Sequence, residues 1–343
     1  MALLALLAVW YVAKDNLREA HLDDTIYYFA SDAPVYLNAY EVLYADATLA
    51  ERPELFLVGS PILFMKLAGG NLSIVLFCQL LLMAISLRVG CNCFRMQRGR
   101  NAFMLGAFVF PYFLFGFVSL NKEVFAMCSA IFFSSYMIRG KWAHAVIALV
   151  LAMCARYYML AALLSLFFFV PRTREPRLGW VVATLLAISI MAPIAKNLIP
   201  QYSSEGLLDA PGFAGILFSQ VIDSFGYIVI YPIKYLALIP LRAYSYVIDP
   251  TRLANAMEGW VSIMTFAVLI PSLLLLRHKR KVDPIVRRLI IAALVAPVLL
   301  MWSEIMHWRY YSFVYFFLLF ALVLHYRDHP AKQRVPADGL SHA

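Results

Sequence analysis

Four basic residues stand beside long apolar stretches and are candidates for binding a phosphate group. Arg156 lies in CARYYM between two apolar runs, and Lys122 lies in SLNKEVFAM, directly before Glu123. Arg242 and Arg309 are the other two. Arginine presents a planar fork of N–H donors to phosphate oxygens, and lysine presents a point charge. If these side chains converge, they would form a site for a phosphate or diphosphate group.

Three acidic residues are candidates for the base that takes a proton from an attacking hydroxyl. Glu123 is one, and Asp24 and Asp32 lie in an acidic segment near the N-terminus. A carboxylate within hydrogen-bond reach of a hydroxyl can act as a general base, and cations that offset charge on a phosphate leaving group lower the barrier. His307 and Tyr310, in the cluster HWRYY, are candidates for contacts with the same phosphate-bearing ligand.

These groups also have structural interpretations. Asn121 is a candidate N-cap, with Glu123 in the first turn of the following helix, where a carboxylate complements the helix dipole. Lys122 is left unexplained, because a cation is unfavourable at that end of a helix. The aromatic cluster around Arg309 fits an interfacial belt. Arg156 is the hardest to explain, because about a dozen apolar residues flank it on each side and a buried cation needs a partner or a function.

The elements that must position these residues are apolar helices. Of the 343 residues, 63% are hydrophobic and 14% are charged, whereas a soluble domain has about half and a quarter. We predict an all-α polytopic membrane protein, a single integral membrane domain over 1–343 with about 10–12 transmembrane helices, some broken or re-entrant. The individual spans are predicted at 2–13, 70–89, 101–119, 124–138, 143–155, 158–171, 178–199, 259–276, 289–302 and 312–325.

The distribution of basic residues among the loops predicts how these spans are oriented in the membrane. The segments RVGCNCFRMQRGR, IRGKW, PRTREPR and RHKRKVDPIVRR, with the tail 326–343, carry 18 of the 29 Lys and Arg but only 4 of the 20 acidic residues. Short basic loops stay in the cytoplasm, so we predict that both termini are cytoplasmic. The acidic segment 14–69, an outer loop with amphipathic segments, then lies on the opposite face together with all the candidate site residues. The net charge of +9 is explained by these loops and requires no nucleic acid partner.

Segment 213–241 does not fit a single span, because both of its ends face the outer side. Asp223, Gly226, Pro232 and Pro240 favour a broken or re-entrant helix there.

The sequence indicates no cofactor site. Its five cysteines have no CxxC spacing, and it contains no GxGxxG, P-loop or DxD motif. We expect no essential metal, because the predicted cations can neutralise a leaving group by themselves.

The order of the motifs resembles that of the EpsG-like and Wzy-type bacterial polysaccharide polymerases. An acidic first outer loop and ERPELFLVGSPILFMKLAGGN are followed by SLNKEVFAMCSAIFFSSYMIRGKW, ALVLAMCARYYMLAALL and HWRYYSFVYFFLLF. The resemblance implies a GT-C-related fold in the bacterial inner membrane. It also implies transfer of a glycan from a polyprenyl-diphosphate-linked donor to a lipid-linked repeat unit at the periplasmic face, with possible polysaccharide-assembly partners. The chain departs from the EpsG-like pattern, which often has an Arg-Gln pair and a His, at Lys122-Glu123 and Arg156.

Two other functions are compatible with the sequence. LDDT, with Asp23 and Asp24, resembles the acidic signature of GT-C glycosyltransferases that transfer one sugar from a polyprenyl phosphate. A transporter or flippase for a lipid-linked saccharide would suit the broken segment 213–241. Product length separates the three functions: a ladder for a polymerase, one added sugar for a transferase, and no change for a transporter.

Overall fold

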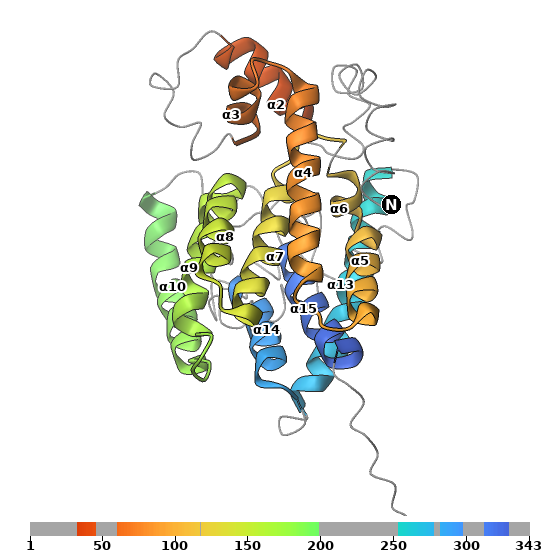
Figure 1. Cartoon of the computed structure of the whole chain (residues 1–343). Helices are drawn as coiled ribbons and strands as arrows, with labels where there is room; N and C mark the ends of the chain where they lie inside the picture. Colours follow the sequence, from red (N-terminus) through yellow and green to blue (C-terminus); the bar gives the residue numbers. More distant parts are fainter. Residues whose placement is uncertain are drawn as a thin grey trace, which may run out of the picture.

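The computed structural model of the chain describes residues 33–45, 60–116, 118–198, 253–277, 282–297 and 312–328. Within these ranges every regular element is helical, with twelve α-helices and two short π-helical turns (Figure 1). The all-α prediction is confirmed for this part of the chain. The predicted first span, the predicted broken segment 213–241 and most of the predicted tail lie outside the described residues.

The helix boundaries follow the apolar runs of the sequence. Predicted spans 70–89, 124–138, 143–155, 158–171 and 178–199 coincide within a few residues with α4, α7, α8, α9 and α10. The bounds are α2 Ala33–Ala39, η2 Tyr40–Tyr44, α3 Ser60–Leu67, α4 Leu72–Cys91, α5 Gln97–Val109, α6 Pro111–Phe115, α7 Glu123–Arg139, α8 Trp142–Ala155, α9 Tyr157–Phe169, α10 Leu178–Leu198, α13 Leu253–Arg277, α14 Pro284–Val295, α15 Ser312–Val323 and η8 Leu324–Asp328.

The prediction of one continuous span over 101–119 is wrong. Pro111 has no N–H to donate and disfavours a helical conformation of the residue before it. Phe110 accordingly adopts an extended conformation (φ −78°, ψ 115°), α5 ends at Val109 and α6 starts anew at Pro111. The carbonyl of Val109 accepts a hydrogen bond from the indole N–H of Trp260 on α13 at 3.0 Å. A distant helix thus satisfies a carbonyl at the break.

Helix α7 is the centre of the bundle. It packs against α4, α8, α14 and α15, and every residue from Glu123 to Met137 is buried. A helix that is apolar all round is expected in such a position. It ends at Arg139, and the next residue, Gly140, has a φ of 75°, a left-handed conformation that glycine adopts readily. The turn there reverses the chain into α8, so the start of α7 and the end of α8 lie at the same end of the bundle (Figure 1).

Helix α15 joins α5 and α7 through aromatic rings. The ring of Phe320 lies 4.6 Å from that of Phe103, and the ring of Phe317 lies 5.9 Å from that of Phe133. Tyr315 donates its hydroxyl hydrogen to a carbonyl of α5 at 2.8 Å, which satisfies its polar tip inside the core. The phenylalanine side chains of α15 therefore form part of the packed core.

Helices α2 and α3, from the predicted outer loop, pack on the N-terminal end of α4. They share a small apolar core with the top of α4 and with the loop before α7. Its buried members are Ala33, Leu37, Met65, Leu72, Val75, Leu76 and Leu120. Part of the predicted outer loop is therefore folded onto the bundle, next to the residue that precedes Asn121.

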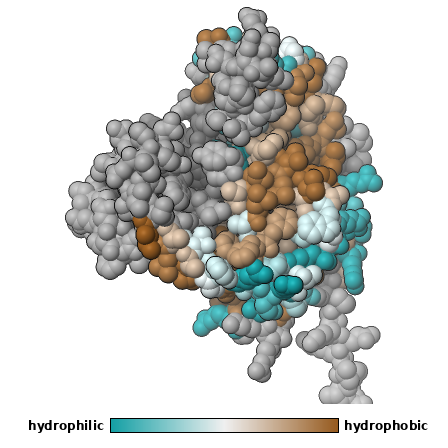
Figure 2. Space-filling view, turned by 90° about the vertical axis from the view of Figure 1, so that its left-hand side faces the viewer, coloured by the Kyte–Doolittle hydropathy of each residue, from teal (hydrophilic) through white to brown (hydrophobic). Residues whose placement is uncertain are grey.

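The basic turns α4–α5, α7–α8 and α9–α10 lie at the opposite, lower end of the bundle, where α13 also ends and α14 begins (Figure 1). Figure 2 shows hydrophilic side chains at this end and a hydrophobic zone above it. Some of these basic residues tie the turns together: Arg172 donates from Nε to the carbonyl of Met137 at 3.2 Å, and Arg287 pairs with Glu175 at 3.4 Å.

Among the described residues, two helical stretches are long and apolar enough to cross a membrane, Leu72–Cys91 and Gly259–Arg277. Shorter apolar helices are Trp142–Ala155, Met159–Phe169, Leu178–Ala187 and Phe313–Arg327.

The close packing of α4 on α5 makes a testable prediction about Gly90. A Cβ at Gly90 would lie 2.4 Å from Cε1 of the fully buried Phe103, whereas a Cβ at Gly179 in α10 would meet nothing within 4 Å. We expect Gly90→Ala to lower stability by about 1–3 kcal/mol through overpacking. The matched change Gly179→Ala should be neutral or raise stability by up to about 1 kcal/mol. Thermal unfolding of the detergent-solubilised chain measures both, and an equal effect of the two variants would contradict the packing of α4 on α5.

Candidate functional site

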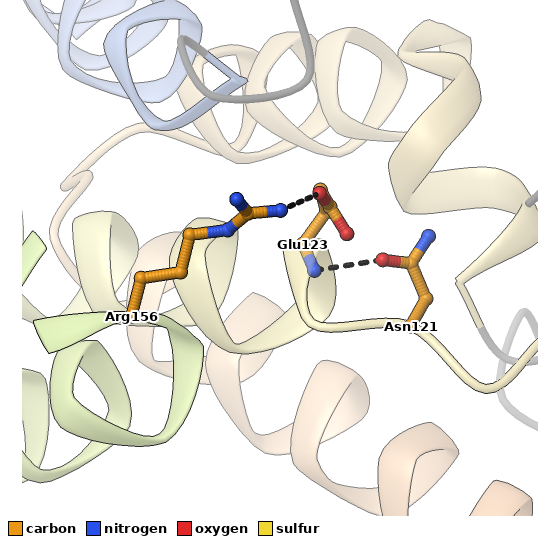
Figure 3. A network of polar contacts seen from close by, with 3 residues as sticks. All are labelled: Asn121, Glu123 and Arg156. Atoms are coloured by element: carbon orange, nitrogen blue, oxygen red, sulfur yellow. Dashed lines mark hydrogen bonds and ion pairs between the residues drawn. The ribbon is translucent and has the colours of Figure 1, made fainter. Parts of the chain in front are cut away.

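Two of the predicted site residues, Glu123 and Arg156, meet at the upper end of the bundle, and a third, Lys122, directly precedes Glu123 in the chain. Arg156 donates from Nη2 to Oε1 of Glu123 at 3.1 Å, and the two form an ion pair between the α8–α9 junction and the start of α7 (Figure 3). The side chain of Glu123 is 6% exposed and that of Arg156 is 18% exposed. The partner that a largely buried Arg156 was expected to need is therefore the carboxylate predicted as a base.

The loop before α7 sets the position of Glu123. Leu120 is fully buried against α2, α3 and α4 and anchors this loop. The side-chain oxygen of Asn121 then accepts a hydrogen bond from the backbone N–H of Glu123 at 2.8 Å (Figure 3). This bond satisfies one of the N–H groups that the first turn of a helix leaves without an intrahelical partner. The N-cap position of α7 is Lys122 and not, as predicted, Asn121, which satisfies this N–H from one position earlier.

Gln79 on α4, which is not among the predicted site residues, supports the same loop. It is 2% exposed, and its amide lies beside the carbonyls of Gly116, Ser119 and Asn121. With its nitrogen turned toward the loop, it donates to Gly116 at 3.1 Å and Ser119 at 3.0 Å. A lone glutamine inside an apolar span was the available signal, since polar side chains in such spans need partners.

Arg156 is held by the junction of two helices. α8 ends at Ala155, Arg156 is extended (φ −166°, ψ 141°), and α9 begins at the next residue. Its N–H donates to the carbonyl of Ala152 at 2.9 Å, and its carbonyl accepts from the N–H of Met159 at 2.9 Å. Both backbone groups of Arg156 are thus satisfied within the junction, which directs its side chain toward α7 (Figure 3).

Lys122 contacts α2, in the segment predicted to be an outer loop. Its ammonium lies 5.0 Å from the centre of the Tyr36 ring of α2, within the range of a cation–π interaction. Two residues after Glu123, Phe125 stacks on Phe64 of α3 with ring centres 5.2 Å apart. The start of α7 is therefore in contact with both α2 and α3.

Among the described residues, Arg156, Glu123 and Lys122 place two cationic side chains and one carboxylate at this end of the bundle. A guanidinium has donors along more than one edge, so contact with a carboxylate through one nitrogen is compatible with binding of phosphate oxygens. Within the described residues, no three His, Cys, Asp or Glu side chains gather in a way that could hold a metal ion.

The other predicted site residues lie outside the described part of the chain. These are Asp24, Asp32, Arg242, His307, Arg309 and Tyr310. Their convergence on Arg156 remains a prediction from the sequence.

A fold alone does not specify a function, and a site supports a function through its own chemistry. The chemistry of this site is a largely buried ion pair with a neighbouring lysine at one end of a helical bundle. No protein-family model, no curated protein and no solved structure matches the chain, so the functional proposal depends on these residues.

Proposed function

We propose that this chain is a polytopic glycosyltransferase of the bacterial inner membrane, of the polysaccharide-polymerase type. It would transfer a glycan from a polyprenyl-diphosphate-linked donor to a lipid-linked repeat unit on the outer face of the membrane. The observation that carries the proposal is the largely buried Arg156–Glu123 pair, with Lys122 beside it, at the end of the bundle opposite the basic turns.

The surface of the bundle supports membrane insertion. Large apolar side chains are exposed on α4, α5, α8, α10 and α13 and would face lipid. Examples with their exposed fractions are Ile85 55%, Leu105 67%, Val146 58%, Ile190 69% and Ile270 51%. With the basic turns in the cytoplasm, the Arg156–Glu123 pair lies toward the outer face, where lipid-linked saccharides would meet it.

In the proposed reaction, a hydroxyl of the acceptor sugar attacks the anomeric carbon of the donor. A new glycosidic C–O bond forms, and the C–O bond to the diphosphate breaks, so that the lipid diphosphate leaves with the bonding electron pair. Arg156 and Lys122 would bind the diphosphate oxygens and offset this charge. Glu123, or an acidic residue of the outer loop, would accept the proton of the hydroxyl.

The ion pair links donor binding to the release of a base. Diphosphate oxygens and the Glu123 carboxylate would compete for the guanidinium of Arg156, which now contacts Oε1 of Glu123. Once the diphosphate occupies part of that guanidinium, the carboxylate can turn toward an acceptor hydroxyl. The order of events would be donor first and acceptor second.

The direct test is gel analysis of lipid-linked glycan from cells that lack the protein and carry either the wild-type chain or Arg156→Ala. Cells without the protein should accumulate single repeats, the wild type should restore a ladder, and Arg156→Ala should not. The matched control is Arg174→Ala, an exposed arginine of the lower end that should restore the ladder. One added sugar with the wild type would instead identify a GT-C transferase, and unchanged chain length would overturn the catalytic proposal.

A further inference from the structure

Three basic side chains surround the turn between α7 and α8, at the lower end of the bundle. Arg139 and Lys141 flank Gly140 in the chain, and both are exposed. The guanidinium of Arg172, from the α9–α10 turn, lies directly over Gly140, since a Cβ at this glycine would come within 2.6 Å of its Cζ and 2.7 Å and 2.8 Å of its two Nη atoms. The missing side chain of Gly140 therefore gives the guanidinium its place in the turn.

Hydrogen bonds to the backbone hold Arg172 in this position. Its Nε donates to the carbonyl of Met137 at 3.2 Å, and its own carbonyl accepts a hydrogen bond from Nη1 of Arg288 on α14. Within the described residues, neither Nη atom of Arg172 has a hydrogen-bond acceptor. A fixed guanidinium with two such donors matches two oxygens of a phosphate group.

The positive charge of this turn is not neutralised within the described part of the chain. The acidic residue of the α9–α10 turn, Glu175, pairs with Arg287 at 3.4 Å and not with any of the three cations around Gly140. Lys141 is the N-cap residue of α8, where the positive end of the helix dipole disfavours a cation. Positive charges placed together in this way attract an anion.

Exposed tryptophans lie on the helices beside these cations. Trp142, the first residue of α8, is 66% exposed and stacks on Phe167 of α9 with ring centres 6.1 Å apart. Trp180, near the start of α10, is 59% exposed and packs edge-on against Phe168, with ring centres 5.7 Å apart. Tryptophan concentrates at the level of the lipid headgroups. The basic turn therefore borders an apolar surface suited to the acyl chains of a lipid.

We infer that Arg139, Lys141 and Arg172 form a binding site for the phosphate of an anionic phospholipid at the lower end of the bundle. Arg172 binds two phosphate oxygens, and the two exposed cations of the α7–α8 turn offset the charge of the headgroup. Basic pockets between helices on the cytoplasmic side of a membrane bind such headgroups. The inference rests on the membrane location in the proposed function and is independent of the proposed reaction.

The test is a titration of the purified full-length chain in a neutral detergent with phosphatidylglycerol, with phosphatidylcholine as the lipid without net charge, followed by native mass spectrometry. The wild type should prefer phosphatidylglycerol. Arg172→Gln should weaken phosphatidylglycerol binding about tenfold, because it removes a charge-assisted contact, and should leave phosphatidylcholine binding unchanged. The matched control is Arg98→Gln, an exposed arginine at the start of α5, which should stay within about twofold of the wild type.

A second variant keeps the test independent of folding, since Arg172→Gln also removes the hydrogen bond to Met137. The double change Arg139→Gln and Lys141→Gln alters only exposed side chains and should weaken phosphatidylglycerol binding at least about fivefold. Unchanged binding in this double variant, or an equal loss in Arg98→Gln, would overturn the site. Binding of inorganic phosphate by the wild type as tight as that of phosphatidylglycerol would assign the site to a soluble anion and overturn the lipid assignment.

The outcomes also distinguish this site from the proposed function. A wild-type chain that makes a glycan ladder but shows no preference for phosphatidylglycerol refutes only the phospholipid site. Phosphatidylglycerol binding that depends on Arg172, in a chain that never changes glycan length, supports the phospholipid site and refutes the proposed function.

Discussion

A chain with the exchanged pair Glu123→Arg and Arg156→Glu should reach nearly wild-type abundance in the membrane yet make no polymer. The pair is 3.1 Å apart and mostly buried, so exchanging both members keeps an attractive contact. The cost should be limited to placing a cation in the first turn of α7, about 0.3–1 kcal/mol. Catalysis should be lost because the guanidinium now lies on α7 and the carboxylate occupies the proposed phosphate position.

The single changes Glu123→Arg and Arg156→Glu provide the comparison. Each places two like charges against one another inside the bundle, and loss of one partner of a buried pair costs about 3–5 kcal/mol. The 18% exposure of Arg156 places the expected loss toward the lower end of that range. Abundance on an immunoblot and thermal unfolding in detergent measure stability, and the glycan ladder measures activity. A ladder from the exchanged chain would show that the pair only stabilises the fold.

Glu41→Cys should react with a membrane-impermeant maleimide in intact spheroplasts, and Arg174→Cys should react only after permeabilisation. Both positions are exposed, with Glu41 in the outer-loop helices and Arg174 in the α9–α10 turn. The expected difference is all-or-none, because a bilayer separates the two positions if the basic turns are cytoplasmic.

The wild-type chain, which has cysteines of its own, gives the background signal in this labelling experiment. Arg95→Cys, exposed in the α4–α5 turn, should behave like Arg174→Cys. Labelling of Arg174→Cys from outside would reverse the proposed orientation. Recovery of the protein in the soluble fraction would refute the membrane location and with it the proposed function.

The proposed donor-first order also explains how Glu123, a carboxylate paired with an arginine, could serve as a general base. A carboxylate paired with arginine is poorly placed to receive a proton while the pair is intact. The competition of phosphate oxygens for Arg156 would make the base available only when a donor is bound. An enzyme built this way would avoid activating a hydroxyl, including that of water, in the absence of donor.

Most helices could be predicted from the sequence because their signals are local. The apolar run before Arg139 and Gly140 predicts both the length of α7 and its end, and Asn121 marks its start. The break at Pro111 has an equally local signal in proline geometry, yet the apolar residues on both sides of it favoured one continuous span. The gathering of basic turns at one end follows from the alternation of short loops along the chain.

The contacts within the site had no such local signal. Arg156 contacts Glu123, which lies 33 positions away in the chain. Lys122 contacts Tyr36 of α2, a helix in the predicted outer loop. Hydropathy and charge predict which side of a membrane a residue faces, but contacts between helices depend on how each helix is rotated and on how its side chains interdigitate with its neighbours. The sequence alone therefore singled out the charged residues and predicted a common side for them. Only the packing of α7 against α8, and of the loop before α7 against α2, paired Glu123 with Arg156 and brought Lys122 over the Tyr36 ring.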